Sequence, residues 1–149
     1  MEAQADYKEL LALFNAHDVR YIIVGAYALA FHGAPRYTGD LDILVRPDEE
    51  NSRHILSALE AFGFGSLGLA VDDFNVPEKV VQLGVPPVRV DIVTSITGVA
   101  WDEAEASCVP GRFGSVPVSY IGKEAFIRNK RALGRKKDLA DAEALCEDQ

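Results

Sequence analysis

Two short apolar runs close together in the chain constrain the fold most strongly, at 21–24 (YIIV) and 41–45 (LDILV). Both are rich in β-branched and aliphatic residues, which favours buried strands. Gly25 ends the first run, where the backbone must come close to another group. Residues 26–33 (AYALAFHG) predict a short helix with Gly33 at its end. A strand, a helix and a second strand in so little chain predict a small sheet with a helix packed beside it.

The rest of the chain alternates helical and strand patterns in the same way. The predicted helices lie at 4–17, 48–62, 101–107, 123–133 and 137–147, and the predicted strands at 79–83, 88–93 and 116–120. We expect a hairpin between 79–83 and 88–93, an edge strand at 116–120, and an irregular Gly-rich segment at 63–78. The fold class is therefore α/β (α+β), a small mixed sheet flanked by helices, with C-terminal helices.

Length and composition predict one globular unit, because 149 residues with 48% hydrophobic and 26% charged side chains suffice for a single core. We expect the core at about 18–96 and a C-terminal helical part at about 122–147. A formal charge of −8 argues against a protein that binds nucleic acid over its whole surface. The N-terminus lacks a signal-peptide pattern, and no run approaches the roughly 18 apolar residues of a membrane span. We therefore expect a cytoplasmic protein without a membrane partner.

Three carboxylates interrupt apolar strands. Asp40 and Asp42 lie two positions apart on one predicted strand and so point to the same face, and Asp91 interrupts VRVDIV at 88–93. Such groups repel one another and lose solvation unless a divalent cation joins them, and an oxygen-only ligand set suits Mg²⁺. If the two strands are neighbours, the three residues form a metal-binding cluster, with Asp91 as general base or bridging ligand. A structural alternative is that Asp40, after Gly39, only ends a turn.

Further candidates flank these carboxylates. The backbone amides of Gly25 and Ala26 are placed to cradle a phosphate at the start of a helix. Arg36 and Thr38 precede the carboxylates and can supply a charge-assisted contact and a hydroxyl donor. We interpret His32 as structural, Asp138 as a charge at a helix N-terminus and Asp141 as a partner for a nearby base.

Together these motifs resemble a known family. The pattern G-x-x-A-x-x-x-H-G-x-x-R-x-T-x-D-x-D is matched by Gly25, Ala28, His32, Gly33, Arg36, Thr38, Asp40 and Asp42, and a second pattern, K-x-x-x-x-R-x-K-D-x-x-D, by residues 130–141. Both are similar to the DNA polymerase beta-like nucleotidyltransferase superfamily. The bacterial branch that they resemble includes AbiEii-like toxins and the minimal nucleotidyltransferases of toxin–antitoxin modules.

The resemblance implies a nucleotidyltransferase that moves a nucleoside monophosphate from a nucleoside triphosphate (NTP) to a hydroxyl with Mg²⁺. It implies that Asp40 and Asp42 bind the metal and that Asp91 activates the acceptor. The candidates for phosphate contacts are Lys130, Arg135 and Lys137, for which solvated helix ends are the simpler alternative. The implied partners are the NTP, an acceptor protein or RNA such as tRNA, and a cognate toxin or antitoxin.

Two departures from the family pattern leave alternatives open. Ala26 stands where many members carry Ser or Gly, so a hydroxyl to the phosphate is missing, and we expect no extra helical domain to hold an acceptor. A catalytically weak or inactive binding and regulatory partner with the same fold is therefore the second hypothesis. A metal-dependent phosphohydrolase is a third and weaker one, because suitably spaced His ligands are missing.

Overall fold

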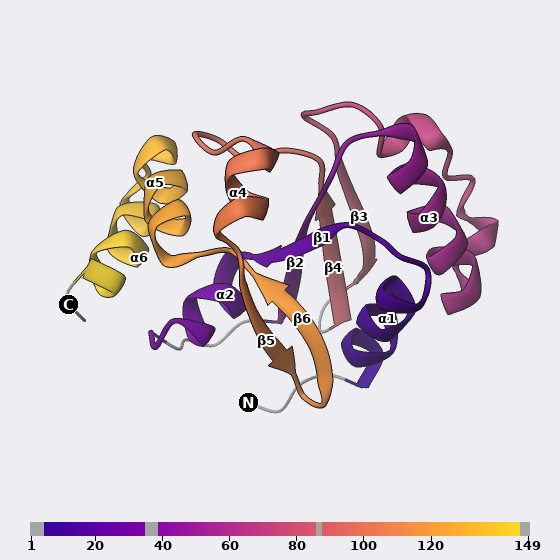
Figure 1. The fold of residues 1–149 in the computed structure, drawn as a ribbon, viewed down its shortest axis with the longest axis horizontal. Helices are drawn as coiled ribbons and strands as arrows, with labels where there is room; N and C mark the ends of the chain where they lie inside the picture. Colours follow the sequence, from indigo (N-terminus) through magenta and orange to yellow (C-terminus); the bar gives the residue numbers. More distant parts are fainter. Residues whose placement is uncertain (1–4, 35–38, 86–87, 147–149) are drawn as a thin grey trace.

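The computed structural model describes residues 5–34, 39–85 and 88–146. The predicted phosphate contacts Arg36 and Thr38, and the hairpin turn residues Pro86 and Pro87, lie outside these residues. Six strands form one mixed sheet in the order β3-β4-β2-β1-β6-β5 (Figure 1). The strands are β1 (Tyr21–Val24), β2 (Asp40–Val45), β3 (Val80–Val85), β4 (Val88–Val93), β5 (Val109–Phe113) and β6 (Val116–Tyr120). The predicted mixed sheet is confirmed.

The helices also follow the apolar spacing. They are α1 (Ala5–Ala16), α2 (Gly25–Phe31), α3 (Glu49–Leu59), α4 (Trp101–Ser107), α5 (Lys123–Leu133) and α6 (Lys136–Cys146). The predicted helix 48–62 is a regular α-helix only as far as Leu59. It continues as a wider π-type turn at Glu60–Phe64, where Gly63 adopts a φ of 108°. Among the described residues, no helix has both the length and the apolar character needed to cross a membrane.

The position of β6 corrects one prediction. Residues 116–120 do form a strand, but it lies inside the sheet between β1 and β5 rather than at an edge. The true edge strand, β5, has the sequence VPGRF and was not predicted, because Pro and Gly weaken a strand pattern. An edge strand tolerates proline, since one side of its backbone needs no hydrogen-bond partner. β3 forms the opposite edge and pairs antiparallel with β4, as expected for a hairpin.

The two faces of the sheet differ in character. Leu41 and Ile43 of β2 share one face with Val90 and Ile92 of β4 by their register, and all four are buried. α1 contacts α3, β4 and β6, and four of its residues are fully buried in the core: Tyr7, Leu10, Leu11 and Phe14. Figure 1 shows α1 and α3 at one end of the molecule and the α5–α6 pair at the other. The charged residues of β2 and β4 lie on the opposite face from Leu41 and Ile43, because strand side chains alternate.

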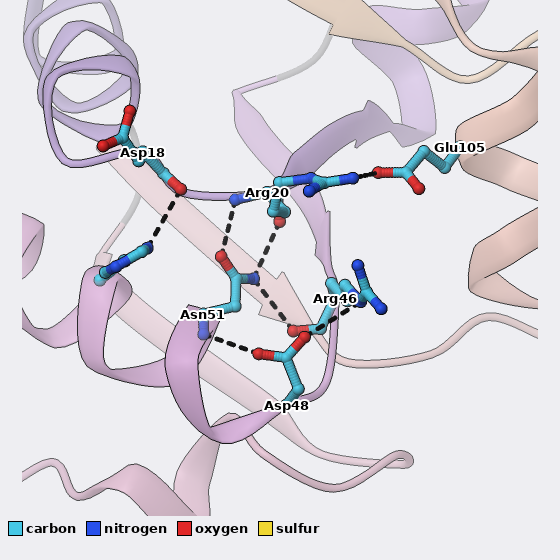
Figure 2. Close-up of polar contacts among 7 residues, drawn as sticks. Asp18, Arg20, Arg46, Asp48, Asn51 and Glu105 are labelled. Carbon is cyan, nitrogen blue, oxygen red and sulfur yellow. Dashed lines mark hydrogen bonds and ion pairs between the residues drawn. The ribbon is translucent and has the colours of Figure 1, made fainter.

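A buried asparagine fastens the ends of β1 and β2 to α3 (Figure 2). Asn51 is 2% exposed; its Oδ1 accepts from the Arg20 amide at 2.7 Å, and its Nδ2 donates to the carbonyls of Arg20 and Arg46, each at 3.0 Å. Asp48 caps α3 by accepting from the Asn51 amide at 2.7 Å. This network lies at the opposite end of the β1–β2 pair from Gly25, since the strands run antiparallel with Tyr21 opposite Val45. It therefore supports the sheet away from the carboxylates.

Candidate active site

The register of β2 and β4 gathers the predicted carboxylates. The two strands are parallel neighbours, with Asp42 directly opposite Asp91 and Asp40 opposite Arg89. Partners in neighbouring strands share a face, and neighbouring strands lie about 5 Å apart. Asp40, Asp42 and Asp91, here called the carboxylate cluster, are thus brought to one side of the sheet. The condition for such a cluster, that the two strands are neighbours, is met.

A cavity of about 330 Å³ opens over the carboxylate cluster. Its lining residues are Gly25, Ala26, Asp40, Asp42, Arg89, Asp91, Lys130, Arg135, Lys137 and Asp141. Every predicted site residue that the structure describes lines this one cavity. The strands β2 and β4 supply Asp40, Asp42, Arg89 and Asp91, whereas Lys130, Arg135, Lys137 and Asp141 come from the other end of the sequence. Larger cavities exist, but they lie away from this cluster.

Gly25 meets Asp42 at the junction of β1 and α2. Its φ is +72°, a left-handed conformation that glycine adopts without strain, and a Cβ at this position would stand 2.2 Å from Oδ2 of Asp42. The close backbone approach predicted at Gly25 therefore involves the Asp42 carboxylate. Any larger residue would displace the Asp42 side chain from its position over the turn.

The surroundings of Asp42 disfavour the ionised form of its side chain. Desolvation by burial, followed by repulsion from Asp91 and Asp40, raises the pKa of Asp42 from 3.8 to about 6. Lys130 and Arg89 act in the opposite direction without offsetting these effects. A divalent cation beside these oxygens would relieve both the desolvation and the repulsion. The donor chemistry of the cluster, carboxylate oxygens only, fits Mg²⁺.

Arg89 modifies this cluster and was not singled out from the sequence. Its Nε and Nη2 donate to the two oxygens of Asp91, each at 3.0 Å, and both side chains are largely shielded from solvent. In the described parts of the chain, no group of three or more His, Cys, Asp or Glu side chains is arranged to hold a metal ion. A complete three-carboxylate ligand set is thus not preassembled. Mg²⁺ typically needs only one or two protein carboxylates, with waters and phosphates completing its shell.

Arg89 could have been found by strand geometry alone. It lies two positions before Asp91 on the same strand, so the alternation that placed Asp40 beside Asp42 also places Arg89 beside Asp91.

Tyr7 connects α1 to the starts of both acidic strands. Its hydroxyl donates to the carbonyl of Gly39 and accepts from the Arg89 amide, the latter at 3.0 Å. Desolvation by burial is the largest cause that raises the pKa of Tyr7, and the nearby carboxylates raise it further. The neutral hydroxyl therefore acts as a fixed bridge between β2 and β4. The sequence pattern showed Tyr7 only as an apolar position of a helix.

Asp138 lies in the first turn of α6, in agreement with its interpretation as a charge at a helix N-terminus. Its side chain is in addition 0% exposed and paired with two cations, which the sequence did not indicate. Arg135 donates from Nε to Oδ2 at 2.5 Å and from Nη2 to Oδ1 at 3.2 Å, and Lys130 Nζ stands 3.8 Å from Oδ1. The hydrogen bond from Arg135 is the largest cause that lowers the pKa of Asp138.

The contacts of His32 agree with its interpretation as a structural residue. Its Nε2 lies 2.6 Å from the carbonyl oxygen of Ile121, to which it donates. This bond ties the end of α2 to the segment between β6 and α5, so His32 supports the turn rather than lining the cavity.

The fold, a mixed six-stranded sheet flanked by helices, is similar to that of solved nucleotidyltransferases. The chain is similar to the inferred nucleotidyltransferase TM1012 of Thermotoga maritima, with a TM-score of 0.63 and 13% identity over 96% of this chain and 91% of that one. It is similar to ANT(2'')-Ia, solved in complex with adenylyl-2''-tobramycin (TM-score 0.61, 15% identity, 95% and 86% of the two chains). It also resembles the lincosamide antibiotic adenylyltransferase LnuA, solved with lincomycin bound (TM-score 0.54, 14% identity, 99% of each chain).

These likenesses concern the fold. No family model matches the sequence, and no curated protein sequence is detectably similar to it. The resemblance to the AbiEii-like branch therefore stays a prediction from the motifs.

Proposed function

We propose that this protein transfers a nucleoside monophosphate from an NTP to a hydroxyl group of an acceptor. The observation that carries the proposal is the cavity itself, where carboxylates on two neighbouring strands and three basic side chains from residues 130–137 line the same space. The carboxylates suit a divalent cation and the basic side chains suit a polyphosphate. Phosphoryl-transfer chemistry depends mainly on positioning and charge neutralisation, which this arrangement provides.

Each part of the cavity has a role in this proposal. Asp40 and Asp42 hold Mg²⁺, which when bound neutralises charge on the triphosphate. The turn at Gly25 and Ala26 brings backbone close to the phosphates. Asp91, next to Asp42 and braced by Arg89, faces the acceptor.

The basic residues Lys130, Arg135 and Lys137 contact the triphosphate. Arg36 and Thr38 are assigned to the same task from the sequence pattern alone. The acceptor oxygen attacks the α-phosphorus and its proton passes to Asp91. The bond between the α- and β-phosphates breaks, and pyrophosphate leaves with the electron pair.

The acceptor is proposed by chemical class and needs a direct comparison. The motif resemblance points to a hydroxyl on a protein or on an RNA such as tRNA, within a toxin–antitoxin pair. The structural neighbours include proteins that act on antibiotics, which adds aminoglycosides and lincosamides to the panel. The acidic charge of −8 disfavours a broad RNA-binding surface, so an RNA would have to meet the local basic face of α5 and α6.

The test is a transfer assay with α-labelled NTPs, Mg²⁺ and a panel of protein, tRNA and antibiotic acceptors. We expect one NTP to label one acceptor class, and Asp42→Asn to abolish the labelling. Asp102→Asn serves as the matched control, because Asp102 is an exposed carboxylate on α4, away from the cavity. Equal labelling by wild type and Asp42→Asn, or none from any NTP and acceptor, would contradict the proposal. The second result would favour the catalytically silent partner suggested by Ala26.

A further inference from the structure

A fully buried carboxylate lies behind the basic side of the cavity. Asp138 belongs to the first turn of α6, and its carboxylate pairs with two cations that line the cavity. Lys130 reaches it from α5 and Arg135 from the junction between α5 and α6. One buried group thus joins the two helices at the point where their basic side chains face the carboxylate cluster.

The contacts leave the cations able to bind something else. Arginine has five N–H donors in a rigid fork, and Asp138 uses two of them in a bidentate contact. The Arg135 side chain is 61% exposed, so its contact with Asp138 restrains a long side chain that otherwise extends into solvent. Lys130 is 15% exposed and makes an ion pair at 3.8 Å, which leaves its ammonium donors available toward the cavity.

We propose that Asp138 is a positioning residue that holds Lys130 and Arg135 in the orientation in which they bind the triphosphate. This inference rests on the proposed nucleotide site. Asp138 itself does not touch the substrate. It fixes two donors before the ligand arrives, so that binding does not have to order two flexible side chains.

A purely structural role makes the opposite prediction for phosphate binding. If Asp138 only stabilises the start of α6, then Asp138→Asn removes one negative charge beside the cavity. The local field becomes more positive, and a polyphosphate should bind equally well or more tightly. If Asp138 positions the cations, the same substitution weakens binding although the charge has become more favourable. The sign of the change separates the two roles.

The probe is inorganic tripolyphosphate with Mg²⁺, because its binding does not depend on which base the protein prefers. Isothermal titration of folded protein should show at least about tenfold weaker binding for Asp138→Asn than for wild type. Binding of Mn²⁺ alone should stay unchanged, since the carboxylate cluster is intact. Glu103→Gln is the matched control: it also breaks a carboxylate–arginine pair of α5, at 2.7 Å to Arg128, but away from the cavity. We expect it to bind tripolyphosphate like wild type.

Asp138→Glu keeps the charge and shifts the carboxylate by one methylene, and it serves if Asp138→Asn does not fold. It should also weaken tripolyphosphate binding, and binding like wild type in either variant overturns the inference. A weakening of equal size in Glu103→Gln does so too, because the effect would then be general. The binding experiment and the transfer assay can fail separately. If Asp138→Asn loses tripolyphosphate binding but the wild type transfers no nucleotide, only the proposed function is contradicted. If the wild type transfers nucleotide but Asp138→Asn binds tripolyphosphate normally, only the positioning role is contradicted.

Discussion

Replacing Asp42 by Asn changes one charge at the centre of the carboxylate cluster and almost nothing in shape. In the folded protein the pKa of Asp42 is about 6, against 3.8 for the ordinary group, so ionising this side chain opposes folding. The interval between these two values corresponds to about 3 kcal/mol at 25 °C. Asn carries no charge at any pH and removes this opposition.

The sign of the pH dependence follows from proton binding. Between 3.8 and about 6 the folded state binds more protons at Asp42 than the unfolded state does, so the free energy of unfolding falls as the pH rises through this window. Below the window the group is neutral in both states and contributes nothing. We therefore expect Asp42→Asn to be more stable than wild type by about 3 kcal/mol at about pH 8, with the difference shrinking toward about pH 4.

Urea unfolding of wild type and Asp42→Asn at several pH values measures this difference. Adding Mg²⁺ should reduce the difference in free energy of unfolding between the two proteins, because a cation at the cluster relieves in wild type the same repulsion that Asn removes. A variant that is less stable than wild type at about pH 8, or a difference that does not change with pH, would show that Asp42 is not electrostatically strained. The same substitution should abolish transfer, so stability and activity are expected to move in opposite directions.

Three further outcomes are expected. Gly25→Ala should cost at least about 2 kcal/mol in urea unfolding and abolish transfer, because the left-handed backbone and the 2.2 Å approach to Asp42 both exclude a Cβ. Asn51→Ala should lower the free energy of unfolding by about 3 kcal/mol, because three hydrogen bonds to Arg20 and Arg46 are lost. The activity of the folded protein should stay unchanged, since these bonds lie at the end of β1 and β2 away from the cavity. Removal of divalent cations with a chelator should stop transfer, and added Mg²⁺ should restore it, measured with the labelled-NTP assay.

Local patterns in the chain were sufficient for the strands and helices that build the cavity. The apolar run YIIV marked β1 with its true limits, and the period of two along DLD placed Asp40 and Asp42 on one face. These features depend only on neighbouring residues. The motif resemblance, rather than any local pattern, linked Lys130, Arg135 and Lys137 to the same site. The expected division into a core at about 18–96 and a C-terminal helical part stays a prediction.

Contacts between distant segments decided the rest. The register that sets Asp42 beside Asp91, and the insertion of β6 between β1 and β5, arise from strand pairing between residues far apart in the chain. The burial of Asp138 depends on how α5 packs on α6, so in the sequence it looked like an ordinary helix charge. Spacing along a chain specifies which face a side chain occupies, but only packing determines which charges meet there and how much water remains between them.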